Sequence, residues 1–251
     1  MSATLHTPRT IFSSRHVPSW ILLAFSAGAV NAMAFCACQR FVTHVTGTAT
    51  QLGVDAGNRW LALDYAIVLA CFLAGAMSSV LALDARQQRG KRPLWAAPLV
   101  TVALLLAGVA VAGHLGTFGP FGASIEEPSD FLMLSVLAFA MGLQNASVAS
   151  TTGLAVRTTH MTGPATDLGI HLATSFFAVG DARRAALRGA ALRGGKLVAF
   201  IVGALAAVPL TRSSGYLAFL LPAVIVVLAA AISFVPEWSG MDVRPPPQPS
   251  S

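Results

Sequence analysis

One eleven-residue phrase occurs twice in this chain and divides it into two related halves. Residues 43–53 read THVTGTATQLG and residues 159–169 read THMTGPATDLG, so eight of eleven positions are identical at a constant offset of 116 residues. Each copy follows an apolar stretch that contains the pair Asn-Ala, which begins at Asn31 in the first half and at Asn145 in the second. An internal duplication predicts two structural repeats, with the phrase at the place where they meet or act.

The scarcity of charge places both repeats in a membrane. Only 10% of the 251 residues are charged and 55% are hydrophobic, whereas about 25% of the residues of a soluble domain are charged. The charges gather between long apolar runs, which predicts an all-α, polytopic transmembrane helical bundle. The formal net charge of +6 suits basic loops at the cytoplasmic face of a membrane. Because no basic face on a soluble domain is visible, nucleic acid is not expected as a partner.

Six apolar runs have the length and composition of membrane-spanning helices. They cover about 19–38, 62–83, 94–114, 131–152, 196–211 and 215–235. We expect one transmembrane domain over 18–235, with repeat one at about 18–115 and repeat two at about 131–235. The polar residues 1–17 are expected to be a disordered N-terminal segment, and the proline-rich residues 236–251 a disordered tail.

Two further segments, 41–58 and 156–179, carry the two copies of the phrase and are too polar for typical lipid-facing spans. Basic clusters lie between spans two and three, at 86–92, and before span five, at 183–196. The positive-inside rule puts both clusters in the cytoplasm, together with both termini of a multi-pass protein of the inner (plasma) membrane. Both clusters lie on that side only if neither polar segment crosses, which predicts two short re-entrant or broken helices.

Six spans and two non-crossing segments make two three-span repeats of opposite orientation. Transporters and channels often use such inverted repeats, with sites near the membrane midplane at discontinuous helices. In the alternative both polar segments cross, giving eight spans, but one or both basic clusters then lie on the wrong side. Arg40 and Arg157 follow spans one and four and are expected to extend to opposite interfaces.

Short patterns shared by the two halves point to a known family. The first half has Ala27-Gly28-Ala29-Val30-Asn31-Ala32, Thr46-Gly47-Thr48 and Leu52-Gly53, and the second has Gly142-Leu143-Gln144-Asn145-Ala146, Thr162-Gly163 and Leu168-Gly169. Together they resemble the YoaK-like family of bacterial inner-membrane proteins over about 18–235. The resemblance implies the membrane location and the fold but no substrate. Where the family pattern has Val-Asp-Ala, this chain has Asn31, so the resemblance supplies no acidic group for ion coupling.

Polar side chains in apolar stretches are the candidates for a solute or proton site, because they are costly in lipid. Asn31, Gln144 and Asn145 lie inside predicted spans, where amides either bond neighbouring helices together or line a path. Asp167 lies four residues before His171, so the two share a helix face and could form a proton-moving pair. The alternative is that Asp167 and His171 stabilise a half-exposed helix near the interface.

The phrase itself contributes the remaining candidates. His44 and His160 occupy matching positions and are candidates for a gate, a proton site or a ligand contact, the alternative being a hydrogen bond to a nearby carbonyl. Two Thr-Gly pairs are typical of helix starts, with threonine as the capping residue: Thr46-Gly47 and Thr162-Gly163. Two helix N-termini that approach from opposite faces would form a site for a polar or anionic solute. The alternative is tight helix packing through small residues.

Other small residues are assigned to packing. Two pairs of small residues have the spacing of helix-packing seams: Gly53 with Gly57, and Gly75 with Ser79. The three cysteines are expected to be buried hydrophobes, not a disulfide or a metal site: Cys36, Cys38 and Cys71.

The function that these patterns favour is a small secondary transporter or permease for an unknown small polar or anionic solute. No phosphate-binding loop, H-E-x-x-H, G-x-S-x-G or Cys-x-x-Cys motif is present, so we expect neither an enzyme nor a metal or cofactor. The expected partner is the lipid bilayer, and a homo-oligomer is left open. The alternative function is a non-transporting scaffold or partner protein, and a membrane enzyme acting on lipid is less favoured.

Overall fold

The computed structural model describes residues 5–7, 10–122 and 128–234, with side chains from residue 131 onward in the last range. All regular elements in these ranges are helical. They are η1 (Thr10–Phe12), α1 (Val17–Cys38), α2 (Val45–Val54), α3 (Arg59–Gln88), α4 (Ala97–His114), α5 (Pro128–Thr151), α6 (Thr162–Phe177), α7 (Gly180–Ser214), η2 (Gly215–Phe219) and α8 (Leu220–Ser233). The predicted proline-rich tail, 236–251, lies outside the described residues.

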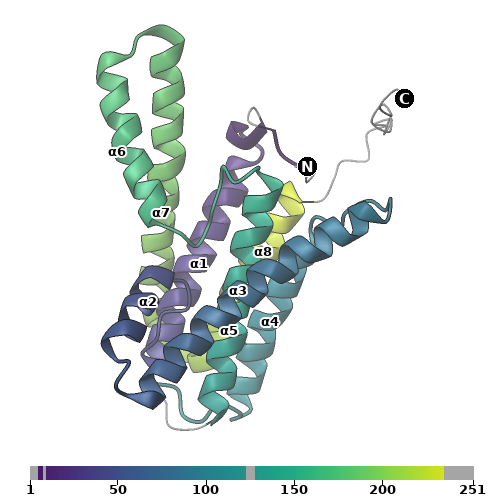
Figure 1. Ribbon diagram of the computed structural model, residues 1–251, viewed down its shortest axis with the longest axis vertical. Coiled ribbons are helices and arrows are strands. Elements are labelled where there is room, and N and C mark those ends of the chain that lie inside the picture. Colours follow the sequence, from purple (N-terminus) through teal and green to yellow (C-terminus); the bar gives the residue numbers. More distant parts are fainter. Residues whose placement is uncertain (1–4, 8–9, 123–127, 235–251) are drawn as a thin grey trace.

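Five helical stretches within the described residues are long and apolar enough to cross a membrane. Four of them are α1, α3, α4 and the 131–151 part of α5, which match the first four predicted spans. The fifth, Gly180–Ser233, contains both remaining predicted spans. Gly215, with a left-handed φ of 52°, ends α7, and η2 and α8 then carry the chain back (Figure 1). The predicted all-α bundle is confirmed, and the chain has the fold of a helical membrane protein.

The two copies of the phrase form short helices that are not among these five stretches. Helix α2 has 10 residues and α6 has 16, lengths of roughly 15 and 24 Å against a hydrocarbon core of about 30 Å. In Figure 1, α2 lies at the lower end of the bundle, whereas α6 and the first half of α7 form a hairpin that extends past the upper end. The two short helices therefore extend toward opposite ends, as the inverted-repeat prediction requires.

The two repeats are held together because helices of one repeat pack against helices of the other. The first helix of each repeat packs against the third helix of the other, α1 on α7 and α5 on α3. Backbones touch at both crossings: a Cβ added at Gly28 would lie 2.0 Å from the Phe200 carbonyl oxygen, and one at Gly142 would lie 2.0 Å from that of Phe72. The reciprocal approaches are made by Gly203 on Phe25 and by Gly75 on Phe139. Since each repeat contains half of both crossings, neither repeat has a complete core by itself.

The two predicted small-residue seams have different outcomes. Gly75 and Ser79 are buried, and Gly75 lies in the α3–α5 crossing, so this seam is confirmed. Gly53 and Gly57 have no atom within 4 Å of an added Cβ, so the second seam is wrong. The reason is that α2 packs on α3 with a face that leaves Gly53 exposed, whereas Gly57 lies in the exposed turn after α2 ends at Val54.

The prediction of a disordered N-terminal segment is wrong for residues 5–7 and 10–17. Ile11 is only 2% exposed and His6 only 3%. The His6 ring lies 5.1 Å from the Trp20 ring, and its backbone N–H donates to the Thr151 carbonyl at 3.0 Å. The polarity of the segment concealed two side chains that fit the end of the bundle, where burial of Ile11 and the rings stabilises the segment.

Candidate solute site between the two short helices

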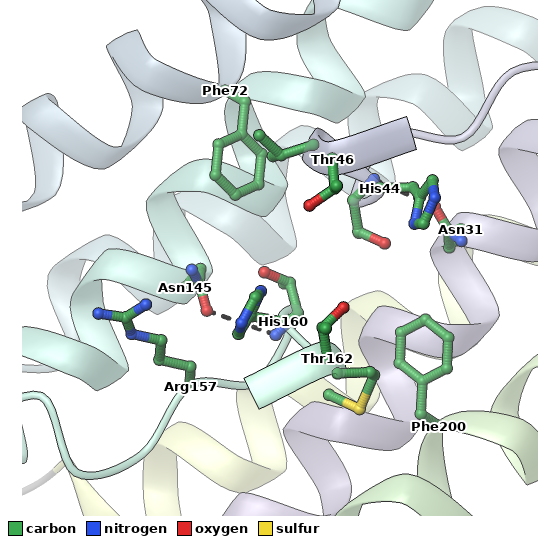
Figure 2. Close-up of a pocket in the computed structure, with 13 residues that line it drawn as sticks. Asn31, His44, Thr46, Phe72, Asn145, Arg157, His160, Thr162 and Phe200 are labelled. Atoms are coloured by element: carbon green, nitrogen blue, oxygen red, sulfur yellow. Dashed lines mark hydrogen bonds between the residues drawn. The ribbon is translucent and has the colours of Figure 1, made fainter. Parts of the chain in front are cut away.

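A cavity of about 340 Å³ lies where the two halves meet, and both halves line it with equivalent residues. Figure 2 shows Thr46 and Thr162 facing the same space, with Phe72 and Phe200 on opposite sides of it. The equivalent pairs are Asn31 and Asn145, Thr43 and Thr159, His44 and His160, Val45 and Met161, Thr46 and Thr162, and Phe72 and Phe200; Arg157 completes the wall. The local two-fold axis that relates the repeats therefore passes through the cavity.

Two asparagines hold the chain as it enters each short helix. Asn31 Oδ1 accepts hydrogen bonds from the backbone N–H groups of Val42 and Thr43, both at 3.1 Å. Asn145 Oδ1 accepts from those of Thr158 and Thr159, at 3.2 and 3.4 Å. Each carbonyl oxygen thus satisfies two donors that no helix pairs, which fixes the approach to α2 and α6.

The histidines explain why glycine follows them three positions later. His160 Nε2 accepts a hydrogen bond from the Gly163 N–H at 3.1 Å, so it caps an otherwise unpaired donor at the start of α6. In the first copy the His44 ring covers Gly47, where an added Cβ would lie 1.9 Å from His44 Cδ2. The prediction that threonine caps these helices is wrong, because no threonine side chain caps α2 or α6.

The proton positions on His160 follow from this bond. A nitrogen that accepts from a backbone N–H carries no proton, so the ring is neutral with its proton on Nδ1. Burial lowers the pKa of His160 below its ordinary value, and the positive charges of Arg157 and Lys196 lower that pKa further. Both effects keep the cap intact near neutral pH.

A second, smaller cavity of about 190 Å³ adjoins the first and shares Arg157 and His160 in its wall. Asp167, Arg193 and Lys196 also line it. Asp167 Oδ2 accepts from Arg193 Nε at 3.0 Å, so the predicted pairing of Asp167 with His171 is wrong. Helix α7 packs along α6 and brings a guanidinium to Asp167.

Three predicted site residues lie outside both cavities: Gly47, which the His44 ring covers, Gln144 and His171. Gln144 is fully buried and donates from Nε2 to the Leu23 carbonyl and to the Thr158 hydroxyl, at 3.1 and 3.3 Å. His171 packs over Gly189 of α7, where an added Cβ would lie 2.8 Å from the ring. These contacts give Gln144 and His171 packing roles between helices.

Sequence reasoning missed the cations at the site. Arg157 was expected at an interface but lines the central cavity. Lys196 was assigned to a basic loop, because the apolar part of the fifth predicted span begins after it. The helix is continuous from Gly180, so Lys196 lies in mid-helix and is 3% exposed. The sequence signal that could have placed Lys196 in a helix is the helix-compatible composition of all 35 residues of α7.

The charges at the site belong to one half only. The four charged residues that line the cavities have uncharged equivalents in the first repeat, at offsets of 116 residues for the phrase and 128 residues for α3 and α7. The pairs are Arg157 and Phe41, Asp167 and Gln51, Arg193 and Tyr65, and Lys196 and Val68. The frame of the site is thus symmetric, whereas its electrostatic field is not.

Comparison with known proteins identifies the family. The profile described as "Protein of unknown function (DUF1275)" matches residues 19–232, so the chain belongs to this family. The resemblance to a family of unknown function is thereby confirmed, and the narrower YoaK-like name stays a prediction. No curated protein and no solved structure matches the chain.

Proposed function

We propose that this member of the DUF1275 family is a small secondary transporter or permease whose solute occupies the central cavity. The observation that carries the proposal is the wall of that cavity, to which two inverted repeats contribute matching residues. Inverted repeats with discontinuous helices at their shared site are the architecture through which many transporters expose one site to each side in turn.

The packing of helices from different repeats forms two helix pairs that could move against each other. One packed pair is α1 with α7 and the other is α3 with α5. Phe200 belongs to the first pair and Phe72 to the second, and these rings lie on opposite sides of the cavity (Figure 2). A rocking of one pair against the other changes the separation of the rings, and this opens the cavity toward one end or the other.

The orientation that we propose has the basic end in the cytoplasm of a cell with an inner membrane. The start of α1, the α3–α4 connection and the tip of the α6–α7 hairpin all lie toward the upper end of the molecule in Figure 1. Two of these regions carry basic clusters, at 86–92 and 183–196. Positive clusters remain on the cytoplasmic side during insertion.

The test combines flux with a site-directed block. In a chain with the three cysteines replaced by alanine, Thr162→Cys places a thiol in the cavity wall, and Thr166→Cys places one a helical turn along α6. Thr166 is the matched control because it is exposed and lies outside both cavity walls. Liposomes that contain either protein are incubated with a cell extract, washed, and analysed by mass spectrometry for retained solutes.

We expect the liposomes to retain at least one solute that protein-free liposomes exclude. A bulky thiol reagent should abolish that uptake for Thr162→Cys and leave it unchanged for Thr166→Cys. The proposal is wrong if no solute is retained, or if both labelled proteins behave alike. Co-purification of a protein partner without flux would favour the scaffold, and conversion of a solute in detergent would favour an enzyme.

A further inference from the structure

The place where the two cavities adjoin, at Arg157 and His160, is here called the joint. It holds more positive charge than the protein itself neutralises. Arg157, Arg193 and Lys196 line the smaller cavity, and Asp167 is the one carboxylate among its lining residues. That carboxylate is already paired with Arg193 at 3.0 Å. Within the described residues, neither the Arg157 side chain nor the Lys196 side chain makes an ion pair or a hydrogen bond.

Lys196 makes this excess costly. The residue is 3% exposed and lines the smaller cavity, and a largely buried ammonium without a charged partner loses much of its hydration. A lysine that served only to pack against its neighbours would have no need of its charge. A side chain of this kind, aimed into a cavity, is explained when the cavity receives a group of opposite charge.

The surrounding neutral groups are also donors. Thr159 is only 4% exposed, and its hydroxyl has no hydrogen-bond partner in the structure. The Asn31 and Asn145 side chains use their oxygens on the backbone, which leaves their NH₂ groups for the cavity. Helices α2 and α6 begin at the same cavity, and their N-termini favour negative charge.

We infer that the solute is a small soluble anion, and that Lys196 and Arg157 supply its counter-charge at the joint of the two cavities. That the anion is transported rests on the proposed function, but binding of the anion at this site does not depend on transport. Cavities of about 340 and 190 Å³ suit an inorganic oxyanion or a short carboxylate. Charge-assisted hydrogen bonds from the two cations hold its oxygens, and the donors of both repeats surround the rest.

The experiment measures anion binding to the full chain in detergent. Sodium chloride, nitrate, sulfate, phosphate, acetate and succinate are added at equal ionic strength, and the unfolding temperature is followed as each concentration rises. An anion that binds the folded state raises this temperature in a saturable way. We expect at least one of the six to do so, with at least tenfold weaker apparent affinity in Lys196→Gln and in Arg157→Gln.

Arg184→Gln is the control for lost charge, because Arg184 pairs with Asp181 near the tip of the hairpin and is 70% exposed. Its apparent affinity should equal that of the wild type. Since Arg157 is itself exposed, Arg157→Gln reports on binding even if Lys196→Gln fails to fold. The inference is overturned if none of the six anions gives a saturable shift, or if the shifts survive in Arg157→Gln unchanged.

The two proposals fail in different ways. Saturable anion binding without flux in liposomes would leave the anion site standing and remove the transport function. Uptake of a neutral or cationic solute that is insensitive to Lys196→Gln and Arg157→Gln would retain transport and remove the anion.

Discussion

Substitution of Gly142 by alanine tests the exchange of helices that holds the repeats together. Gly142 lies on α5, where an added Cβ would come within 2.0 Å of the Phe72 carbonyl oxygen of α3, against an ordinary contact of at least 3.4 Å. The obstacle is backbone, which cannot rotate out of the way as a side chain can. The two helices must therefore separate by roughly 1.4 Å in a tightly packed region.

The expected cost follows from that separation. A radial gap of about 0.5–1 Å already forfeits a quarter to a half of the dispersion energy of a contact, and overpacked sites lose about 1–3 kcal/mol. Alanine recovers about 0.8–1.0 kcal/mol of helix propensity relative to glycine. Because the obstacle is backbone, we take the upper end of the overpacking range, about 3 kcal/mol, and subtract about 1 kcal/mol of helix propensity. We therefore expect Gly142→Ala to lower the free energy of unfolding by about 2 kcal/mol, which corresponds to about 4–8 °C in the unfolding temperature of a chain this long.

Thermal unfolding in detergent, followed by loss of the monodisperse species, measures the effect. Gly108→Ala is the control, because Gly108 lies inside α4 with no atom within 4 Å of an added Cβ. This control should raise the unfolding temperature by about 1–4 °C through helix propensity alone. Gly75→Ala acts on the same crossing, so its combination with Gly142→Ala should cost less than the two single changes added together. If Gly142→Ala unfolds at or above the wild-type temperature, the backbone contact between α3 and α5 does not exist.

Two further predictions concern histidines. Gly47→Ala should leave the unfolding temperature nearly unchanged, because the added Cβ meets only the His44 ring, but it should reduce flux in liposomes by displacing that ring into the cavity; unaltered flux would contradict the placement of the ring. Burial, with the charge of His16, lowers the pKa of His6 from 6.5 to about 4, so only the unfolded chain takes up a proton between these values. Stability should fall by up to about 3 kcal/mol as the pH drops from 6.5 to 4, and His6→Phe should lose this component when both proteins are melted across that pH range; equal slopes would contradict the burial of His6.

What could be predicted from the sequence was the part that depends on composition along the chain. Long apolar runs predicted the spans, and the basic clusters around 86–92 and 183–196 predicted that the two polar segments do not cross, in keeping with the short helices α2 and α6. The exchange of α1 and α5 between repeats was not predictable, because apolar periodicity says which face is buried but not which helix covers it. Lys196 was assigned to a loop because the apolar run marks only the later part of the helix. Helix α7 begins at Gly180, well before that run.

The site combines a symmetric frame with an asymmetric charge, and the two properties have separate physical origins. Asn31 and Asn145 perform the same backbone task in both repeats, so duplication preserved the geometry that places two helix starts at one cavity. The cations Arg157 and Lys196 have Phe41 and Val68 as equivalents, so an anion bound beside them loses its counter-charge if it moves across the local two-fold axis. A transport cycle built on this frame, as we propose, has one strongly binding position, on the side of the α6–α7 hairpin, and the anion must leave that counter-charge before it can be released on the other side.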